Sequence, residues 1–545
     1  MSVAWWEEAV FYQIYPRSFM DSNGDGIGDL PGIMEKLDYF VELGIDALWI
    51  SPFFPSPMRD FGYDVADYRG IDPIFGDAGD FAALMREAKK RGIRIVLDLV
   101  ANHSSDEHPW FIEARASRDS PKHDWYIWVP DTGSPPNNWK AVFELGSAWH
   151  PNPETGERYL GTFTRHQPEF DWRNPELRAA FYDNMRYWYD LGVDGFRLDV
   201  ATAYMKDPDL RSNPFSFRAV PDFFQKHRYD RNHPDFHQVF REMRQVADES
   251  PAEGPSSSAP GERVLIAEPY GEDAELAASC HGDAGDELHM AFNFEFLKQP
   301  WDAKAFRVSA ERWYELLPKG AWPNFTLGNH DKPRSAWRYR SRKPAITEAR
   351  AKVAAAMLLT LKGSPFLYYG EEIGMTCQRL PRAALRDPLG IATWPLGFLG
   401  RDPERTPMQW NGAPDGGFGS RSSWLPMNAD WQARNVEAQK ADPDSLFSWY
   451  KSLTSLRREE AALRHGEIRF MDSGKEILSY ERLDGHSGGK ILVYLNFSSR
   501  RIRIGIGKEL SVLLGSHRDA GSVIAPGSAE LGPCEALIAR RAPYY

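Results

Sequence analysis

Short apolar runs alternate, from residue 11 to about residue 460, with longer segments in which apolar residues recur at helical spacing. This alternation is typical of a parallel sheet, whose strands are buried on both faces and are joined by helices. Eight units of this kind predict a (β/α)8 TIM barrel, in which functional residues occupy the carboxyl ends of the strands. The predicted strands are Phe11–Tyr15, Ala47–Ser51, Arg94–Val100, Gly195–Ala201, Val264–Glu268, Met290–Phe294, Asn324–Asn329 and Pro365–Tyr369.

Two helices between these strands carry clear start and stop signals. Asn174 is a suitable N-cap, and Pro175 favours the first turn of a helix that runs to Leu191. A second helix follows Asp77 and is expected to stop at Gly92. The first helix places its apolar residues on one face: Leu177, Phe181, Met185 and Trp188.

Three segments do not fit a simple barrel. About 70 residues separate His103 from Asn174, too many for a plain loop, so a subdomain is predicted to overhang the strand ends there. The Pro- and Ser-rich segment Pro251–Pro260 predicts a flexible surface loop. The segment Thr376–Trp410 follows the last barrel strand and is well placed to line a pocket.

The pattern changes again near the end of the chain. Beyond Gly466, short alternating strands such as Ile491–Leu495 follow one another without a long helix, which predicts an antiparallel β domain. The predicted division is a barrel of residues 1–103 and 174–465, an inserted subdomain of residues 104–173, and a C-terminal β domain of residues 466–545.

Composition narrows the function classes. The net charge of −12 argues against a nucleic-acid partner, and no apolar stretch of about 20 residues predicts a membrane span. The N-terminus lacks the basic and apolar regions of a signal peptide, so a cytoplasmic location is expected. Three widely spaced cysteines (Cys280, Cys377 and Cys534) suit neither a disulfide framework nor a zinc site. The sequence does not indicate an oligomeric state.

The predicted strand ends carry a concentrated set of polar residues. Arg197 and Asp199 stand two residues apart at the end of the fourth strand, so they should point to the same face. The fifth strand ends at Glu268, and the seventh is followed by His330 and Asp331. With His103 after the third strand, three carboxylates, two histidines and an arginine should meet at one barrel mouth.

Glycoside cleavage requires this kind of set, because one carboxylate attacks the sugar and a protonated one releases the leaving group. Arg197 should lower the pKa of Asp199 and favour it as the nucleophile. Glu268 ends an apolar strand, where partial burial should raise its pKa and suit it to proton donation. A metal hydrolase is the main chemical alternative, but no dense ligand motif is present.

The motifs resemble those of the alpha-amylase family, glycoside hydrolase family 13. The resemblance implies a retaining mechanism with Asp199 as nucleophile, Glu268 as acid/base and Asp331 as transition-state stabiliser, the first two about 5–5.5 Å apart. Other segments are similar to its alpha-glucosidase and oligo-1,6-glucosidase branch. The segments that carry the resemblance are 98–103, 195–199, 267–268 and 329–331 for the family, and 13–19, 62–68, 167–172 and 405–410 for the branch.

The resemblance also implies sugar-binding positions. Tyr63 is expected to stack on the innermost glucose, and Asp64 and Arg401 to grip its non-reducing end and close the pocket. His103 and His330 should bind sugar hydroxyls, with Arg197 beside the nucleophile. Three residues of the overhanging subdomain should either line the pocket or form the subdomain core, and these are Phe143, Phe163 and Gln167.

The loop from Asp21 to Asp29 has oxygen side chains at alternate positions and glycines for a sharp turn, as calcium loops do. Runs of Asp, Asn and Gly are also ordinary turns. By resemblance to this branch, the loop is expected to hold a structural Ca²⁺, with Mg²⁺ as an alternative, through Asp21, Asn23, Asp25, Asp29 and the carbonyl of Ile27.

The expected activity is that of an exo-acting alpha-glucosidase on disaccharides and short oligosaccharides. The resemblance implies cleavage of alpha-1,6 bonds as well, because Val at the position of Val200 accompanies that activity in this branch. Val200 also offers no hydroxyl that could fix a 1,4-linked acceptor. Ala267 and Pro269 beside Glu268 depart from the usual family pattern on the leaving-group side. Two alternatives remain, namely a sucrose isomerase or glucosyltransferase on the same site, and a non-catalytic sugar-binding relative.

Overall fold

The computed structural model describes residues 3–217, 224–249, 262–395, 400–485 and 488–541. The surface loop predicted at Pro251–Pro260 lies outside these residues. Within them, no helix has both the length and the apolar character required to cross a membrane. Cys280, Cys377 and Cys534 are free thiols and are buried.

Eight parallel strands form the barrel sheet, in the order β10-β11-β1-β2-β3-β7-β8-β9. All eight predicted strands are present, and the predicted fold class is confirmed. Each strand is buried along nearly its whole length, as expected when helices cover the outside of the sheet. The strands are β1 (Phe11–Ile14), β2 (Ala47–Ile50), β3 (Arg94–Leu99), β7 (Gly195–Leu198), β8 (Val264–Ala267), β9 (Met290–Ala291), β10 (Asn324–Thr326) and β11 (Ser364–Tyr368).

The predicted helix signals operate as expected. The Asn174 side chain caps α6 by accepting hydrogen bonds from two backbone N–H groups. Asp77 forms a capping box with Asp80 at the start of α4. The helices are α1 (Trp5–Glu8), α2 (Leu30–Glu35), α3 (Leu37–Leu43), α4 (Ala78–Lys90), α5 (Pro109–Ala116), α6 (Pro175–Asp190), α7 (Phe236–Asp248), α8 (Ala274–Ser279), α9 (Phe294–Leu297), α10 (Ala303–Leu316), α11 (Ser335–Arg338), α12 (Pro344–Thr360), α13 (Pro388–Ala392), α14 (Val436–Lys440), α15 (Leu446–Glu459) and α16 (Ala461–Arg464).

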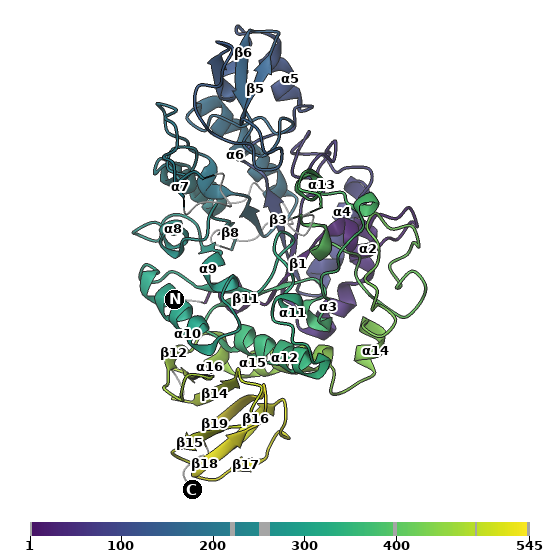
Figure 1. The fold of residues 1–545 in the computed structure, drawn as a ribbon, viewed down its shortest axis with the longest axis vertical. Helices are drawn as coiled ribbons and strands as arrows, with labels where there is room; N and C mark the ends of the chain where they lie inside the picture. Colours follow the sequence, from purple (N-terminus) through teal and green to yellow (C-terminus); the bar gives the residue numbers. More distant parts are fainter. Residues whose placement is uncertain (1–2, 218–223, 250–261, 396–399, 486–487, 542–545) are drawn as a thin grey trace.

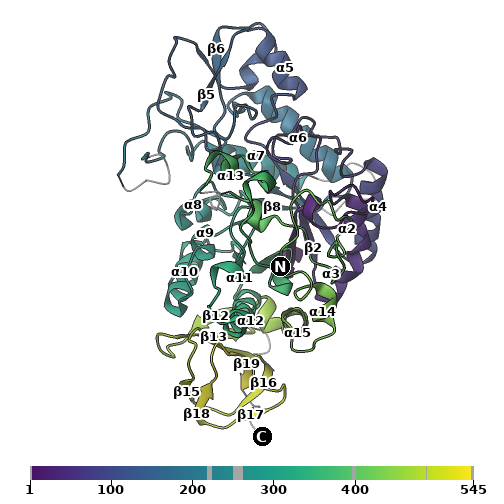
Figure 2. The same ribbon diagram turned by 45° about the vertical axis from the view of Figure 1, so that its right-hand side comes forward.

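The inserted subdomain has a small core of its own. Strands β4 (Trp128–Pro130), β5 (Trp149–Asn152) and β6 (Glu157–Leu160) form an antiparallel sheet in the order β4-β6-β5. Trp139 and Trp149 are buried together with their ring centroids 6.0 Å apart. Figures 1 and 2 show the subdomain at the end of the molecule opposite the C-terminal domain.

The C-terminal domain is antiparallel, as predicted. One sheet has the order β12-β13-β14-β19-β16-β17, and β15 pairs with β18 to form a second sheet. The domain joins the barrel through α12, where the Thr360 and Tyr480 hydroxyls lie 2.6 Å apart. The strands are β12 (Glu467–Phe470), β13 (Ile477–Leu483), β14 (Lys490–Asn496), β15 (Ile502–Ile506), β16 (Leu510–Gly515), β17 (Val523–Ile524), β18 (Gly527–Leu531) and β19 (Ala536–Arg541).

Candidate active site

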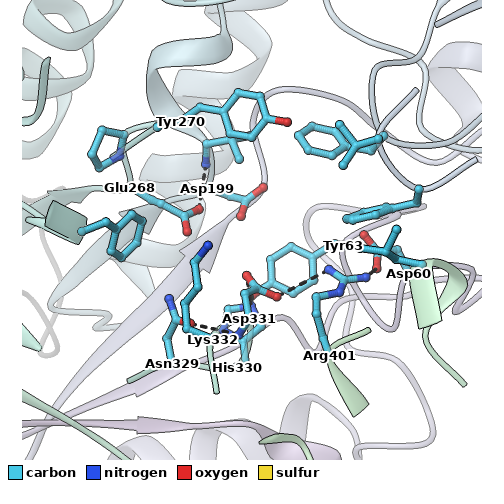
Figure 3. Close-up of a pocket in the computed structure, with 18 of the residues that line it drawn as sticks. Asp60, Tyr63, Asp199, Glu268, Tyr270, Asn329, His330, Asp331, Lys332 and Arg401 are labelled. Carbon is cyan, nitrogen blue, oxygen red and sulfur yellow. Dashed lines mark hydrogen bonds and ion pairs between the residues drawn. The ribbon is translucent and has the colours of Figure 1, made fainter. Parts of the chain in front are cut away.

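A pocket of about 720 Å³ lies at the carboxyl ends of the barrel strands, and residues of the inserted subdomain form part of its lining. Figure 3 shows the residues around it. Eleven of the predicted site residues line it, whereas Arg197 lies directly behind the carboxylates and Asp64 lies outside the lining. The predicted residues in the lining are Tyr63, His103, Phe143, Phe163, Gln167, Asp199, Val200, Glu268, His330, Asp331 and Arg401.

Arg197 holds three carboxylates around one fully buried guanidinium. Its Nη1 lies 2.6 Å from Asp98 and 2.8 Å from Asp199, and its Nη2 forms an ion pair with Glu268. Asp98 is the last residue but one of β3, Arg197 lies in β7, and Glu268 directly follows β8. Parallel strands in register therefore deliver the groups to one point, as the sequence predicted for Arg197 and Asp199.

The predicted pKa of Asp199 requires a correction. Burial raises the pKa of Asp199 well above its ordinary value, and the neighbouring carboxylates of Glu268, Asp98 and Asp331 raise it further, while Arg197 lowers it. One guanidinium does not offset burial together with several carboxylates. The pKa of Asp98 is likewise raised by burial, to about 6. Ionised Asp199 is therefore favoured only at a higher pH than an isolated carboxylic acid requires.

Asp331 has the opposite environment. Burial alone would raise its pKa, but His330, Arg405 and Arg401 together lower the pKa of Asp331 well below its ordinary range. The Arg405 Nη2 lies 2.7 Å from this carboxylate, and the Arg401 Nη1 lies 3.5 Å from it. Asp331 thus stays ionised, and the pocket holds two carboxylates whose surroundings separate their pKa values.

His330 belongs to a hydrogen-bonded chain that defines its neutral form. Burial lowers the pKa of His330 well below its ordinary value. Its Nδ1 lies 2.8 Å from the amide nitrogen of Gln13, which can only donate, so Nε2 carries the proton. That Nε2–H donates to the Tyr63 hydroxyl at 2.7 Å, and the hydroxyl donates to Asp98 at 3.0 Å. The Tyr63 and His330 rings are stacked at 5.3 Å.

The structure also corrects the prediction for Asp64. At the end of the pocket where Arg401 lies, here called the inner end, Asp60 takes the place expected of Asp64. Asp60 pairs with Arg401 at 2.6 Å and lines the pocket. Asp64 is fully buried, and its carboxylate accepts hydrogen bonds from the Ser56 hydroxyl and from the N–H groups of Arg59 and Asp60. Asp64 therefore supports the turn that presents Asp60 to the pocket.

Arg401 closes this inner end through several contacts. Besides Asp60, its guanidinium contacts Asp387, with 2.8 Å between Nε and the carboxylate. The guanidinium also lies over the Phe143 ring, 4.2 Å from its centroid. Gln167 donates to Asp60 at 3.2 Å and lies 3.1 Å from His103. Inserted-subdomain residues thus contribute directly to the pocket wall.

Phe163 joins the same wall, since its ring lies 5.2 Å from His103 and 5.9 Å from Phe143. Two roles were predicted for Phe143, Phe163 and Gln167, namely pocket lining or subdomain core. The structure places all three residues in the pocket lining. Burial lowers the pKa of His103 to about 4, so the imidazole at this wall is neutral at physiological pH.

Val200 has an unusual backbone conformation. Its φ of +38° lies in the left-handed region, which a β-branched residue rarely adopts. This conformation directs the Val200 N–H to the Glu268 carboxylate at 3.1 Å, while the N–H of Ala201 donates to the Glu268 carbonyl at 2.8 Å. The strained turn after Asp199 therefore helps to orient Glu268.

Several functional positions escaped the sequence predictions. Asp60, Asp98 and Arg405 stand within or directly beside the quoted motifs and could have been found there. Asn329 lies within the segment 329–331, and Lys332 directly follows it. Others lie in loops outside the motifs, namely Asp387 behind Arg401 and the lining residues Arg231 and Tyr270.

The predicted calcium loop forms a chain of tight turns. Asp21 accepts hydrogen bonds from two glycine N–H groups at 2.6 and 2.8 Å, and Asp29 accepts from Ser22 and caps α2. Asn23 and Asp25 each accept from the N–H two residues ahead. The described residues contain no group of three or more His, Cys, Asp or Glu side chains that could hold a metal ion. Calcium at this loop, through Asp21, Asn23, Asp25, Ile27 and Asp29, stays a prediction.

Comparison with known proteins bears on the whole chain. The family model described as "Alpha amylase, catalytic domain" matches residues 13–466. A probable alpha-glucosidase of Rhizobium meliloti is 41% identical over 91% of this chain and 89% of its own. An oligo-1,6-glucosidase of Parageobacillus thermoglucosidasius is 38% identical over 92% of each chain.

Solved structures also resemble this fold. The alpha-glucosyl transfer enzyme XgtA matches with a TM-score of 0.91 and 37% identity, over 99% of this chain and 100% of its own. The trehalulose synthase MutB from Pseudomonas mesoacidophila MX-45 matches over the same shares with a TM-score of 0.89 and 34% identity. The chain belongs to the alpha-amylase family, glycoside hydrolase family 13, and is a glycoside hydrolase of its alpha-glucosidase and oligo-1,6-glucosidase branch.

Proposed function

We propose that the protein is a retaining, exo-acting alpha-glucosidase that removes terminal glucose from disaccharides and short oligosaccharides. One observation carries this proposal: Asp199, Glu268 and Asp331 face one pocket whose inner end is closed by ion pairs of Arg401. A closed inner end accommodates a chain terminus and leaves no path for a polysaccharide to pass through. Names of similar proteins, alpha-glucosidase and oligo-1,6-glucosidase, agree with it.

In the first step, an Asp199 oxygen attacks the anomeric carbon while protonated Glu268 gives its proton to the departing glycosidic oxygen. The carbon–oxygen bond to the leaving group breaks as the bond to Asp199 forms. In the second step, Glu268 removes a proton from water, which displaces Asp199 and restores both carboxyl groups. The ionised Asp331, held by Arg405 at 2.7 Å, stabilises the positive charge that the sugar ring develops.

Linkage preference belongs to the leaving-group side. Val200 lines the pocket directly after Asp199 and provides apolar surface there. A hydroxyl at this position would favour one orientation of a 1,4-linked sugar by hydrogen bonding. We therefore assign the protein activity on more than one linkage, including alpha-1,6, with starch as a poor substrate.

A second candidate function is sucrose isomerisation or glucosyl transfer, which the likeness to the trehalulose synthase and to XgtA favours. Both reactions share the first step and differ in the acceptor of the second. Incubation with sucrose, maltose, isomaltose and trehalose, followed by product identification, separates them. Glucose as the main product supports hydrolysis. Sucrose isomers or longer glucosides as the main products would support isomerisation or glucosyl transfer instead of hydrolysis.

The Asp21–Asp29 loop is proposed to bind Ca²⁺ and to stabilise the fold away from the chemistry. Its oxygen side chains, although engaged by N–H groups, keep further lone pairs for a cation. Chelation should then lower the Tm more than it lowers turnover at moderate temperature. No metal in the purified protein at saturating calcium, with no change in Tm, would leave the loop as a set of turns.

A further inference from the structure

The charged groups that line the pocket are distributed unevenly between its two ends. At the inner end, the cation Arg401 is fully engaged by Asp60, Asp387 and Asp331. Figure 3 shows Glu268, Asn329 and Lys332 on the opposite side of the pocket from Asp60 and Arg401. Because the acid/base group must contact the departing oxygen, this opposite side is the leaving-group side, an assignment that rests on the proposed function.

Lys332 provides a free positive charge on that side. It directly follows Asp331 and lines the pocket, and its side chain is half-buried. Within the described part of the chain, its ammonium makes no hydrogen bond and no ion pair, although Asp331 and Glu268 both line the same pocket. A partly desolvated ammonium without a partner is more costly than a solvated one, so a site with such a group favours an anionic ligand.

Arg231 contributes a second charge to the lining. Its guanidinium lies over the Tyr270 ring, 4.4 Å from the ring centroid, and Tyr270 itself packs against Phe163. Stacking on a ring occupies the face of the guanidinium and leaves its in-plane N–H donors available. Among the described residues, these donors make no hydrogen bond or ion pair. A third cation, Lys298, is already paired with Glu272.

Lys332 thus stands on the side where the leaving group must lie, and Arg231 lines the same pocket on the ring of Tyr270, two residues after Glu268. We propose that this side binds an aglycone that carries an anionic group, either a carboxylate or a phosphate ester, through Lys332 and Arg231. The preferred substrates are then alpha-glucosides of acidic aglycones, and neutral disaccharides are cleaved less efficiently. With a neutral aglycone, neither cation has an ion-pair partner among the described residues, and the charge of Arg231 is felt only by the neighbouring Asp230, whose pKa it lowers.

The test compares pairs of substrates that differ only in charge. Maltobionate and maltitol share an open six-carbon aglycone and differ in a carboxylate against a hydroxymethyl group. Trehalose 6-phosphate and trehalose form the phosphate pair. We expect kcat/KM to be about tenfold higher for the anionic member of at least one pair, as for one charge-assisted contact. This advantage should shrink at high ionic strength, because both cations are partly exposed.

Variants assign the effect to the named residues. Lys332→Gln should remove most of the anionic advantage, and adding Arg231→Gln should abolish it. Lys319→Gln, at an exposed lysine outside the pocket, is the matched control and should keep the full advantage. A preference in only one substrate pair identifies carboxylate or phosphate as the recognised group. Equal kcat/KM within both pairs, or an advantage that survives both substitutions, would overturn the proposal.

A binding measurement separates this proposal from that of the glucosidase. Calorimetry on an Asp199→Asn variant compares the Kd of maltobionate with that of maltitol without turnover. Tighter binding of maltobionate, lost on adding Lys332→Gln, supports the anion site even if hydrolysis is not observed. Cleavage of 4-nitrophenyl alpha-glucoside without any anionic preference in rate or binding would reject the anion site and leave the glucosidase proposal standing.

Discussion

The two ends of the pocket are built in contrasting ways. At the inner end, Asp60, Asp387 and Asp331 surround Arg401 in a closed set of ion pairs. On the leaving-group side, Lys332 and Arg231 have no ion-pair partner among the described residues. A ligand of a different shape at the inner end would have to break or rearrange these ion pairs. On the leaving-group side, Lys332 and Arg231 can reorient toward different ligands without breaking an ion pair.

This difference suggests a division of labour. The inner end recognises one terminal sugar, which every substrate of an exo-acting enzyme shares. The leaving-group side determines linkage, acceptor and aglycone, which are the properties that differ among similar hydrolases, transferases and isomerases. The following predictions test the division from the largest expected effect to the smallest.

Asp199 stands where the two ends meet, so its loss should affect every substrate alike. Asp199→Asn keeps the shape but removes the attacking charge, and kcat should fall by more than about a thousandfold on all substrates. Folding should persist, because the amide retains a hydrogen bond to Arg197. Steady-state kinetics and circular dichroism check both points, and a variant with substantial turnover would remove Asp199 from the nucleophile role.

Glu268 belongs to the leaving-group side, so the effect of Glu268→Gln should depend on the aglycone. A disaccharide with a poor leaving group should lose about 10²–10⁴-fold in kcat/KM. The loss for 4-nitrophenyl alpha-glucoside should be far smaller, since its leaving group needs little protonation. Equal losses on both substrates would contradict the acid/base assignment. They would also show that Glu268 does not act specifically on the leaving group.

Asp60 and Asp64 form a matched pair for the inner end. Asp60→Asn removes one partner of a buried ion pair, and such a loss weakens binding by about 2–5 kcal/mol. The fold-decrease in kcat/KM should be the same for every substrate with a terminal glucose. Asp64→Asn should lower Tm and reduce kcat/KM much less than Asp60→Asn does, because Asp64 acts on the pocket only through the turn that it supports. The reverse pattern would restore Asp64 to the site.

Val200→Thr should give the smallest effect and should act on linkage alone. A new hydroxyl near the leaving group is worth about 0.5–1.5 kcal/mol, so the ratio of kcat/KM for isomaltose to that for maltose should fall several-fold. Valine and threonine are both β-branched, so the left-handed backbone at this position is equally strained for both. A difference between the variant and the wild-type protein therefore reports the hydroxyl rather than backbone strain. An unchanged ratio would separate Val200 from linkage preference.

Much of the fold and of the catalytic centre was predictable because it follows local rules. Eight buried strands could be read from their apolar runs, and the alternation of side chains along a strand placed Arg197 beside Asp199. Helix caps such as Asn174 were equally local. The family motifs then supplied roles for residues that already stood at strand ends.

What the sequence could not provide depends on how separate loops meet. The loop after β2 contains Asp60 and Asp64, and only the hydrogen bonds of the folded turn decide which one faces the pocket. The pKa of Asp199 was predicted from one neighbour, but burial and three further carboxylates reverse its direction. Lys332 directly follows the motif at 329–331 and Arg231 lies in a loop, but neither has a spacing to other charged residues that would mark it as a binding group.

The most direct test of the central claim is the configuration of the first glucose released. Proton NMR of the anomeric signals during early hydrolysis of 4-nitrophenyl alpha-glucoside, whose aglycone is not a sugar, distinguishes the two anomers of the released glucose before mutarotation. Attack by Asp199 followed by water inverts the carbon twice, so the account predicts alpha-glucose as the initial product. Beta-glucose as the initial product would show a single displacement by water and would contradict the role assigned to Asp199.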